Sequence, residues 1–127
     1  FSKELPNVTH LFEDSLLFDF SSLGQRFDLI FIDGDHHYES VKKDTEKVFE
    51  HLVHDKSIVV WHDYAWQAGE VRYETLDAIL AGVPVHLKGK IYAVRNTMCA
   101  VYFPDEVSAH SPSAIAVKEE AFEIRIK

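Results

Sequence analysis

The chain has 127 residues, of which 46% are hydrophobic, 13% aromatic and 27% charged, a composition typical of one soluble globular domain. It carries 13 basic and 21 acidic residues, and its net charge of −8 argues against binding to nucleic acid or to an anionic membrane. No stretch approaches the roughly 20 apolar residues of a membrane-spanning helix. A single cysteine, Cys99, excludes an internal disulfide framework and fits the expected cytoplasmic location.

The first half of the chain predicts an alternation of strands and helices. Residues 8–12 are a short apolar segment that predicts the end of a strand, and residues 16–24 predict a short helical turn or loop closed by Gly24. Residues 27–32 form a nearly continuous apolar run, the pattern of a strand covered on both faces in a parallel sheet. Residues 38–53 place apolar side chains near helical spacing, which predicts an amphipathic helix on that sheet.

The second half continues the alternation and then turns polar. Residues 57–61 predict another buried strand and residues 71–80 another helix. Residues 85–94 and 98–103 predict two more strands, joined by a hairpin-like turn at 95–97.

The order of these elements predicts an open α/β sheet, parallel at first and ending in a hairpin that adds one antiparallel strand. Residues 104–127 predict a polar C-terminal extension, in which only residues 122–126 alternate well enough to indicate a terminal strand.

Two turns that follow consecutive buried strands carry acidic residues and histidines. The first runs from Asp33 to His37, and the second contains His62 and Asp63. Open α/β sheets bind ligands at the carboxyl ends of their strands, and if the two strands are neighbours the carboxylates of Asp33 and Asp63 come within metal-bridging reach. Together with a histidine imidazole, these two carboxylates would provide oxygen and nitrogen ligands that suit Mg²⁺, Mn²⁺ or Zn²⁺. A structural reading stays open, because Asp and Gly are ordinary turn formers and Asp35 is an ordinary helix N-cap.

Residues 27–41, which include the string IDGDHHYE, together with Asp44 and residues 58–64, resemble the class I S-adenosylmethionine-dependent methyltransferases. Within these they are most similar to a small-molecule O-methyltransferase-like branch that carries an IDGDHxYE turn. The resemblance covers about residues 8–103 and implies a partial Rossmann-like sheet. In this family the strands have the spatial order 3-2-1-4-5-7-6. Residues 8–103 would supply strand 3 and the contiguous half 4-5-7-6.

The resemblance also implies how much of the cofactor site is present. The glycine-rich loop and the acidic residue that hold the methionine and ribose parts of the cofactor in this family have no counterpart in residues 1–127. We therefore expect residues 1–127 to be the C-terminal part of a single methyltransferase domain and to bind S-adenosylmethionine poorly alone. Unpaired backbone groups at the sheet edge would favour self-association as a homo-oligomer or pairing with further N-terminal residues.

Residue roles follow from the same resemblance. Asp14 and Ser15 match the acidic turn beside the adenine of the cofactor, and Asp33 and Tyr38 belong to the turn that borders it. Asp33 also matches the aspartate that binds a divalent cation in the metal-dependent relatives.

His62 and Asp63 match the pair that completes the metal site, although His62 stands where those relatives usually have a carboxylate. His36 falls where they place a basic residue near the acceptor hydroxyl, which makes it the candidate general base beside Asp33.

The resulting hypothesis is a methyltransferase that uses S-adenosylmethionine, with a small molecule or sugar as the acceptor and with or without Mg²⁺ or another divalent cation. Two alternatives remain: a metal-dependent hydrolase or phosphoesterase built on the Asp and His turns, and a non-catalytic remnant that serves as an interaction module. The acceptor itself is not encoded in the fold.

Overall fold

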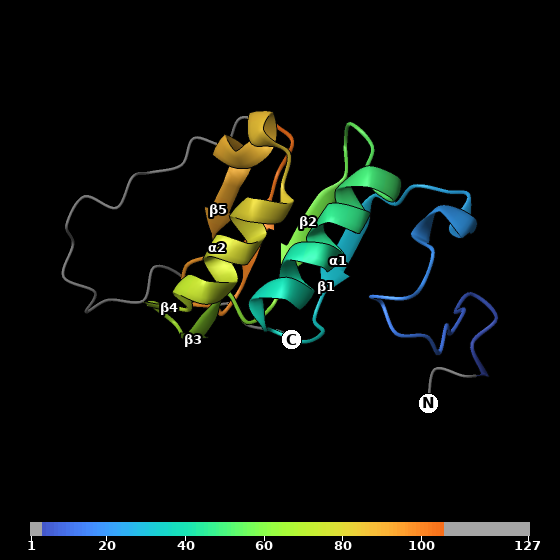
Figure 1. Ribbon diagram of the computed structural model, residues 1–127, viewed down its shortest axis with the longest axis horizontal. Coiled ribbons are helices and arrows are strands. Elements are labelled where there is room, and N and C mark those ends of the chain that lie inside the picture. The colour runs from blue at the N-terminus through green and yellow to red at the C-terminus, as the bar shows by residue number, and fades with distance from the viewer. Residues whose placement is uncertain (1–3, 106–127) are drawn as a thin grey trace, which may run out of the picture.

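A computed structural model describes residues 4–105, which form one α/β unit with a four-stranded sheet (Figure 1). Its strands are β1 (Leu29–Ile32), β2 (Ile58–Trp61), β5 (Ile91–Ala93) and β6 (Ala100–Tyr102), in the spatial order β1-β2-β6-β5. β1 and β2 are parallel, whereas β6 is antiparallel to both of its neighbours. The expected start as a parallel sheet and end as an antiparallel hairpin are both confirmed.

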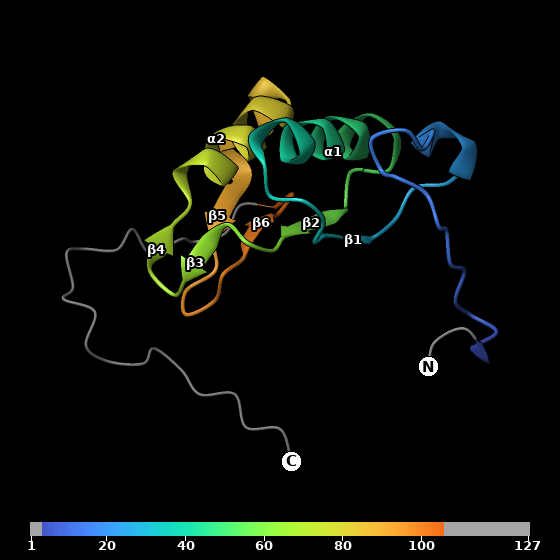
Figure 2. The ribbon, with the colours of Figure 1, turned by 60° about the horizontal axis from the view of Figure 1, so that its bottom comes forward.

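Two helices, α1 (Tyr38–His51) and α2 (Tyr73–Gly82), lie side by side on one face of this sheet (Figure 2). Between helices and sheet, the ring of Phe49 stacks on Trp61 and meets Tyr102 edge-on, with centroids 6.2 and 5.1 Å apart. The fully buried core consists of side chains from both helices, the segments that follow them and the inner face of the sheet: Val41, Val48, Leu52, Val59, Trp61, Ala78, Ile79, Val83, Ala100 and Tyr102. No helix in residues 4–105 combines the length and the apolar character needed to cross a membrane.

One hydrogen bond ties α1 to β2 inside this core. The indole Nε1 of Trp61 donates to Oγ1 of Thr45 at 2.9 Å, and the two residues are 1% and 0% exposed. Thr45→Val keeps the shape of the side chain but leaves the indole N–H without a partner. We expect the variant to lose about 1–3 kcal/mol of unfolding free energy, because a buried donor without a partner carries its full desolvation cost. Urea unfolding measures this loss.

The double variant Thr45→Val, Trp61→Phe is the control for that bond. It removes donor and acceptor together, so its loss should be smaller than the sum of the two single losses by about 1 kcal/mol. Strictly additive losses would show that the bond contributes nothing to stability.

Several expected elements form close to their predicted bounds. The predicted helices 38–53 and 71–80 are α1 and α2, and the strands at 57–61 and 98–103 contain β2 and β6. The turn at 95–97 is present, with Asn96 at a φ of 59°. The turn at 16–24 contains a 3-10 helix, η2 (Phe20–Leu23), closed by Gly24 at a φ of 61°. The predicted strand at 122–126 lies outside the described residues, as does nearly all of the polar extension.

The predicted strand at residues 8–12 is wrong. This segment is exposed and has no strand partner within residues 4–105, and its Phe12 is 77% exposed. A strand needs a neighbour for its backbone hydrogen bonds, so an apolar run alone does not produce one.

The prediction that residues 27–32 are covered on both faces is also wrong for the part of the chain that the structure describes. The side chains of β1 alternate, and Leu29 and Phe31 are 63% and 55% exposed on the face away from the helices. Both helices lie on the other face, as Figure 2 shows.

Two further differences concern short segments. The predicted strand 85–94 is largely a 3-10 helix, η3 (Val85–Lys90), and only Ile91–Ala93 forms β5. Pro84 starts this helical turn, because its carbonyl accepts the N–H of Leu87 at 2.9 Å. The small hairpin formed by β3 (Ala65–Gln67) and β4 (Glu70–Val71) was not predicted from the sequence. Its turn has Gly69 at a φ of 89°.

Candidate functional site

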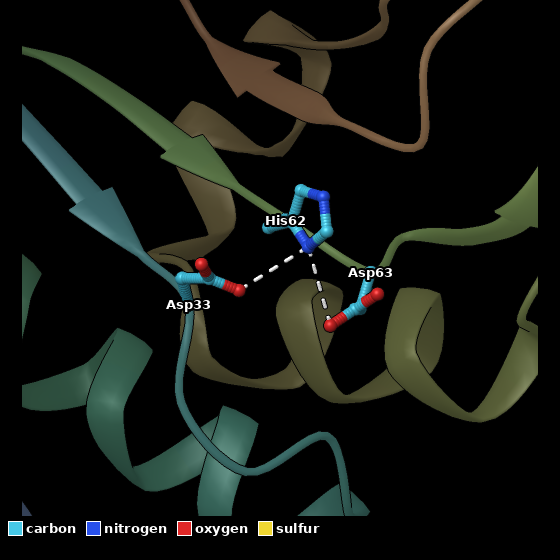
Figure 3. Close-up of side chains that lie close together, drawn as sticks. All are labelled: Asp33, His62 and Asp63. Carbon is cyan, nitrogen blue, oxygen red and sulfur yellow. Dashed lines mark ion pairs between the residues drawn. The ribbon is translucent and has the colours of Figure 1, made fainter.

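The candidate site lies where β1 and β2 end side by side. Ile32 is opposite Trp61 in the parallel register, and the N–H of His62 donates to the carbonyl of Ile32 at 2.9 Å. The residues that follow both strands therefore meet at one edge of the sheet, as Figure 3 shows for Asp33, His62 and Asp63. Asp63 has a φ of 58°, a left-handed conformation that is uncommon outside glycine and recurs at functional sites.

The three side chains present their ligand atoms to one another. Nδ1 of His62 lies 3.2 Å from Oδ1 of Asp33 and 3.2 Å from Oδ2 of Asp63. Each of the three residues offers one ligand atom, and these three atoms lie within 4.8 Å of one another. The sequence expectation that these residues come together is thus correct, while their role as metal ligands stays a prediction.

The donor set fits a divalent cation. Nδ1 of His62 is buried and has no hydrogen-bond partner, although two carboxylate oxygens lie beside it. An orphaned imidazole nitrogen between two carboxylates is satisfied when a cation binds all three groups, and mixed oxygen and nitrogen ligands suit Mn²⁺ or Zn²⁺ as well as Mg²⁺. With a protonated imidazole the same groups would form an ion-pair cluster without metal.

His36 lies at the same place. Together with Asp33, His62 and Asp63 it lines a small hollow of about 10 Å³, and its ring stacks on that of His37 with centroids 5.5 Å apart. His36 therefore lies near Asp33, and its role as general base stays a prediction.

Asp35 fastens the turn between β1 and α1. Its Oδ2 accepts the hydroxyl of Ser40 at 2.7 Å, and its Oδ1 contacts Nδ1 of His37. These hydrogen bonds lower the pKa of Asp35 to about 2, and the bond from Ser40 has the largest effect. The hydrogen bond to Asp35 in turn raises the pKa of His37. The N-cap position belongs to His37 and not to Asp35, which holds the helix start by its side chain instead.

The variant Ser40→Ala is expected to raise the pKa of Asp35 toward its ordinary value of 3.8, because the largest cause of the lowering is removed. With the pKa lowered, the ionised carboxylate stabilises the fold above pH 3.8, and this contribution disappears as the pH falls toward 2. The raised pKa of His37 acts in the opposite sense: its contribution is present below pH 6.5 and is lost as the pH rises through the folded-state pKa.

An NMR titration of the side-chain carboxyl carbons measures this shift. Asp19 is an internal control, because its pKa is lowered by Ser21 and should not move in the Ser40→Ala variant. An unchanged titration of Asp35 would contradict the assigned cause.

Asp14 and Ser15 lie in a separate turn, which α1 holds in place. Nζ of Lys47 donates to the carbonyl of Ser15 at 2.7 Å, and Oδ1 of Asp14 accepts the N–H of Leu16 at 2.9 Å. Neither residue lines the hollow at Asp33. Their proposed contact with adenine is not tested by this arrangement.

Asp44 connects the two turns. It is 7% exposed, Ser15 hydrogen-bonds to it, and a Cβ added at Gly34 would lie 3.7 Å from its Oδ2. Burial raises the pKa of Asp44, and the hydrogen bond from Ser15 and the charge of Lys47 oppose that rise.

Tyr38 borders a different cavity. Its N–H donates to Oε1 of Glu74 at 3.4 Å, and its side chain lines an open groove of about 510 Å³ between the starts of α1 and α2. The structure therefore does not bring Tyr38 to the hollow that holds Asp33, and its role toward the cofactor stays a prediction.

Open α/β sheets bind their ligands at the carboxyl edge, which is where these polar side chains gather. A family model described as a methyltransferase domain matches residues 2–64, just under half of the chain, and this segment contains β1, α1, β2 and all of Asp33, His62 and Asp63. The match supports a methyltransferase domain, a family for which S-adenosylmethionine is the general methyl donor. Neither the curated proteins nor the solved structures include a match to this chain.

Proposed function

We propose that the protein transfers a methyl group from S-adenosylmethionine to an oxygen of a small molecule or sugar, with a divalent cation held by Asp33, His62 and Asp63. The observation that carries the proposal is the buried Nδ1 of His62, which lies between two carboxylates at the strand ends of a segment that matches a methyltransferase domain.

The proposed site residues have two roles, binding of the cation and transfer of a proton. Asp33 and Asp63 would hold the cation through their carboxylate oxygens and His62 through Nδ1. When bound, the cation would lower the pKa of an acceptor hydroxyl and orient its oxygen. His36 lines the same hollow and takes the proton from that hydroxyl, a task suited to an imidazole because it exchanges protons near neutral pH.

The cofactor is assigned to residues of three separate segments. Asp14 and Ser15 are proposed to contact adenine, and Asp33 and Tyr38 to border the cofactor. The order β1-β2-β6-β5 with an antiparallel β6 supports the assignment of these strands as 4-5-7-6 of a methyltransferase sheet. The outer edge of β1 has no strand partner within residues 4–105, which supports the proposal that this chain is one part of a larger domain.

The test uses the protein expressed from its full reading frame. Calorimetry should detect binding of S-adenosylmethionine in the micromolar range, and S-adenosylhomocysteine should compete for the same site. Absence of binding would overturn the proposal. Hydrolysis of an aryl phosphate with Mn²⁺ and without cofactor binding would instead favour the hydrolase, which the family match does not favour.

A further inference from the structure

The hairpin β3–β4 begins two residues after Asp63 and lies at the edge toward which β1 and β2 point (Figure 1). Arg72 follows β4, and its N–H donates to the carbonyl of Tyr64 at 2.9 Å. The backbone of Arg72 therefore lies beside Tyr64, the residue that follows Asp63.

The side chain of Arg72 stacks on an aromatic ring and pairs with no acid. Its guanidinium carbon lies 3.5 Å from the centre of the Trp66 ring. Nε and Nη1 are buried without a hydrogen-bond partner, and no ion pair of Arg72 is present among residues 4–105. Unpaired buried donors cost free energy that a bound acceptor group would recover.

We infer that Arg72, with Trp66 as its platform, binds an oxyanion carried by the acceptor, either a carboxylate or a phosphate. The stack occupies one face of the guanidinium and fixes its plane, so that the N–H groups around its edge remain for the forked pairing that arginine makes with such oxyanions. Trp66 is 64% exposed, so the stacked pair lies at the surface of the protein.

The neighbouring acids explain why such an anchor is needed. The carboxylates of Asp33 and Asp63 repel an anionic group of the acceptor. An acceptor with a carboxylate or a phosphate would gain a favourable contact with the positive charge of Arg72. This inference rests on the proposed function and names the class of its acceptor.

The experiment titrates the full-length protein with inorganic phosphate and, separately, with acetate, and follows tryptophan fluorescence. Trp61 is buried in the core and Trp66 is exposed on Arg72, so a ligand that disturbs the stack changes the emission of Trp66. We expect a saturable change with at least one of the two anions. A response to phosphate assigns a phosphate and a response to acetate assigns a carboxylate.

Two variants test whether Arg72 is the residue that binds the anion. Arg72→Gln should weaken binding at least about 10-fold, because the charge and the fork are lost while much of the length is kept. Arg95→Gln is the matched control, since Arg95 is an exposed arginine in the turn between β5 and β6, and it should bind as the unchanged protein does. No saturable response, or equal binding by Arg72→Gln, would overturn the inference.

The result is separable from the proposed function, because the titration contains neither S-adenosylmethionine nor a metal. Anion binding at Arg72 without cofactor binding would contradict the methyltransferase proposal alone. Cofactor binding without an anion response would contradict only the role of Arg72.

Discussion

Replacing Gly82 by alanine is expected to lower the free energy of unfolding by about 3 kcal/mol, the upper part of the usual range for overpacked cores. Gly82 is the buried last residue of α2, and a Cβ there would lie 2.7 Å from the backbone carbonyl oxygen of Lys42 and 2.7 Å from Cβ of Thr45. Since neither atom is the end of a flexible side chain, α1 must move away from α2. Thermal unfolding should shift downward by on the order of 10 °C.

Gly89→Ala provides the matched control for this prediction. A Cβ at Gly89 meets nothing within 4 Å, and the residue is exposed. Its effect should remain within about 0.5 kcal/mol. If Gly82→Ala were as stable as Gly89→Ala, the close approach of the two helices would be contradicted.

The region from β1 to β2 is predictable because its signals are local. The apolar run before Asp33, the helical spacing after Tyr38 and the apolar run before His62 each specify one element without reference to the rest of the chain. One helix between two strands makes them parallel neighbours, which brings Asp33 together with His62 and Asp63. This is why three side chains from separate turns could be assigned to one site.

The remaining features depend on partners that local patterns do not encode. The apolar residues 8–12 have the composition of a strand but lack a strand to pair with in the described structure. The exposure of Leu29 and Phe31 depends on which face the helices occupy. Arg72 gives no signal in the sequence, because its stacking on Trp66 arises only when the short hairpin forms.

Asp33→Asn is expected to weaken binding of Mn²⁺ at least about 10-fold, equivalent to about 1.4 kcal/mol. The change removes one of the two negative charges beside His62 while it preserves the shape of the side chain. Under the proposed function, the rate of methyl transfer should also fall on the order of 100-fold, since a cation that orients the acceptor oxygen would bind less tightly. Calorimetry with Mn²⁺, Mg²⁺ and Zn²⁺ measures the first effect, and transfer from labelled S-adenosylmethionine measures the second.

Asp28→Asn carries the same change of charge at the opposite end of the same strand. Asp28 directly precedes β1, and its almost fully exposed side chain forms a surface pair with His54 at 3.1 Å. This variant should bind cations and transfer methyl groups as the unchanged protein does, because exposed pairs contribute little. Equal cation affinity in Asp28→Asn and Asp33→Asn would show that any binding comes from the overall negative charge. Absence of cation binding by the unchanged protein would instead make Asp33, His62 and Asp63 an ion-pair cluster that fixes the turns at the strand ends.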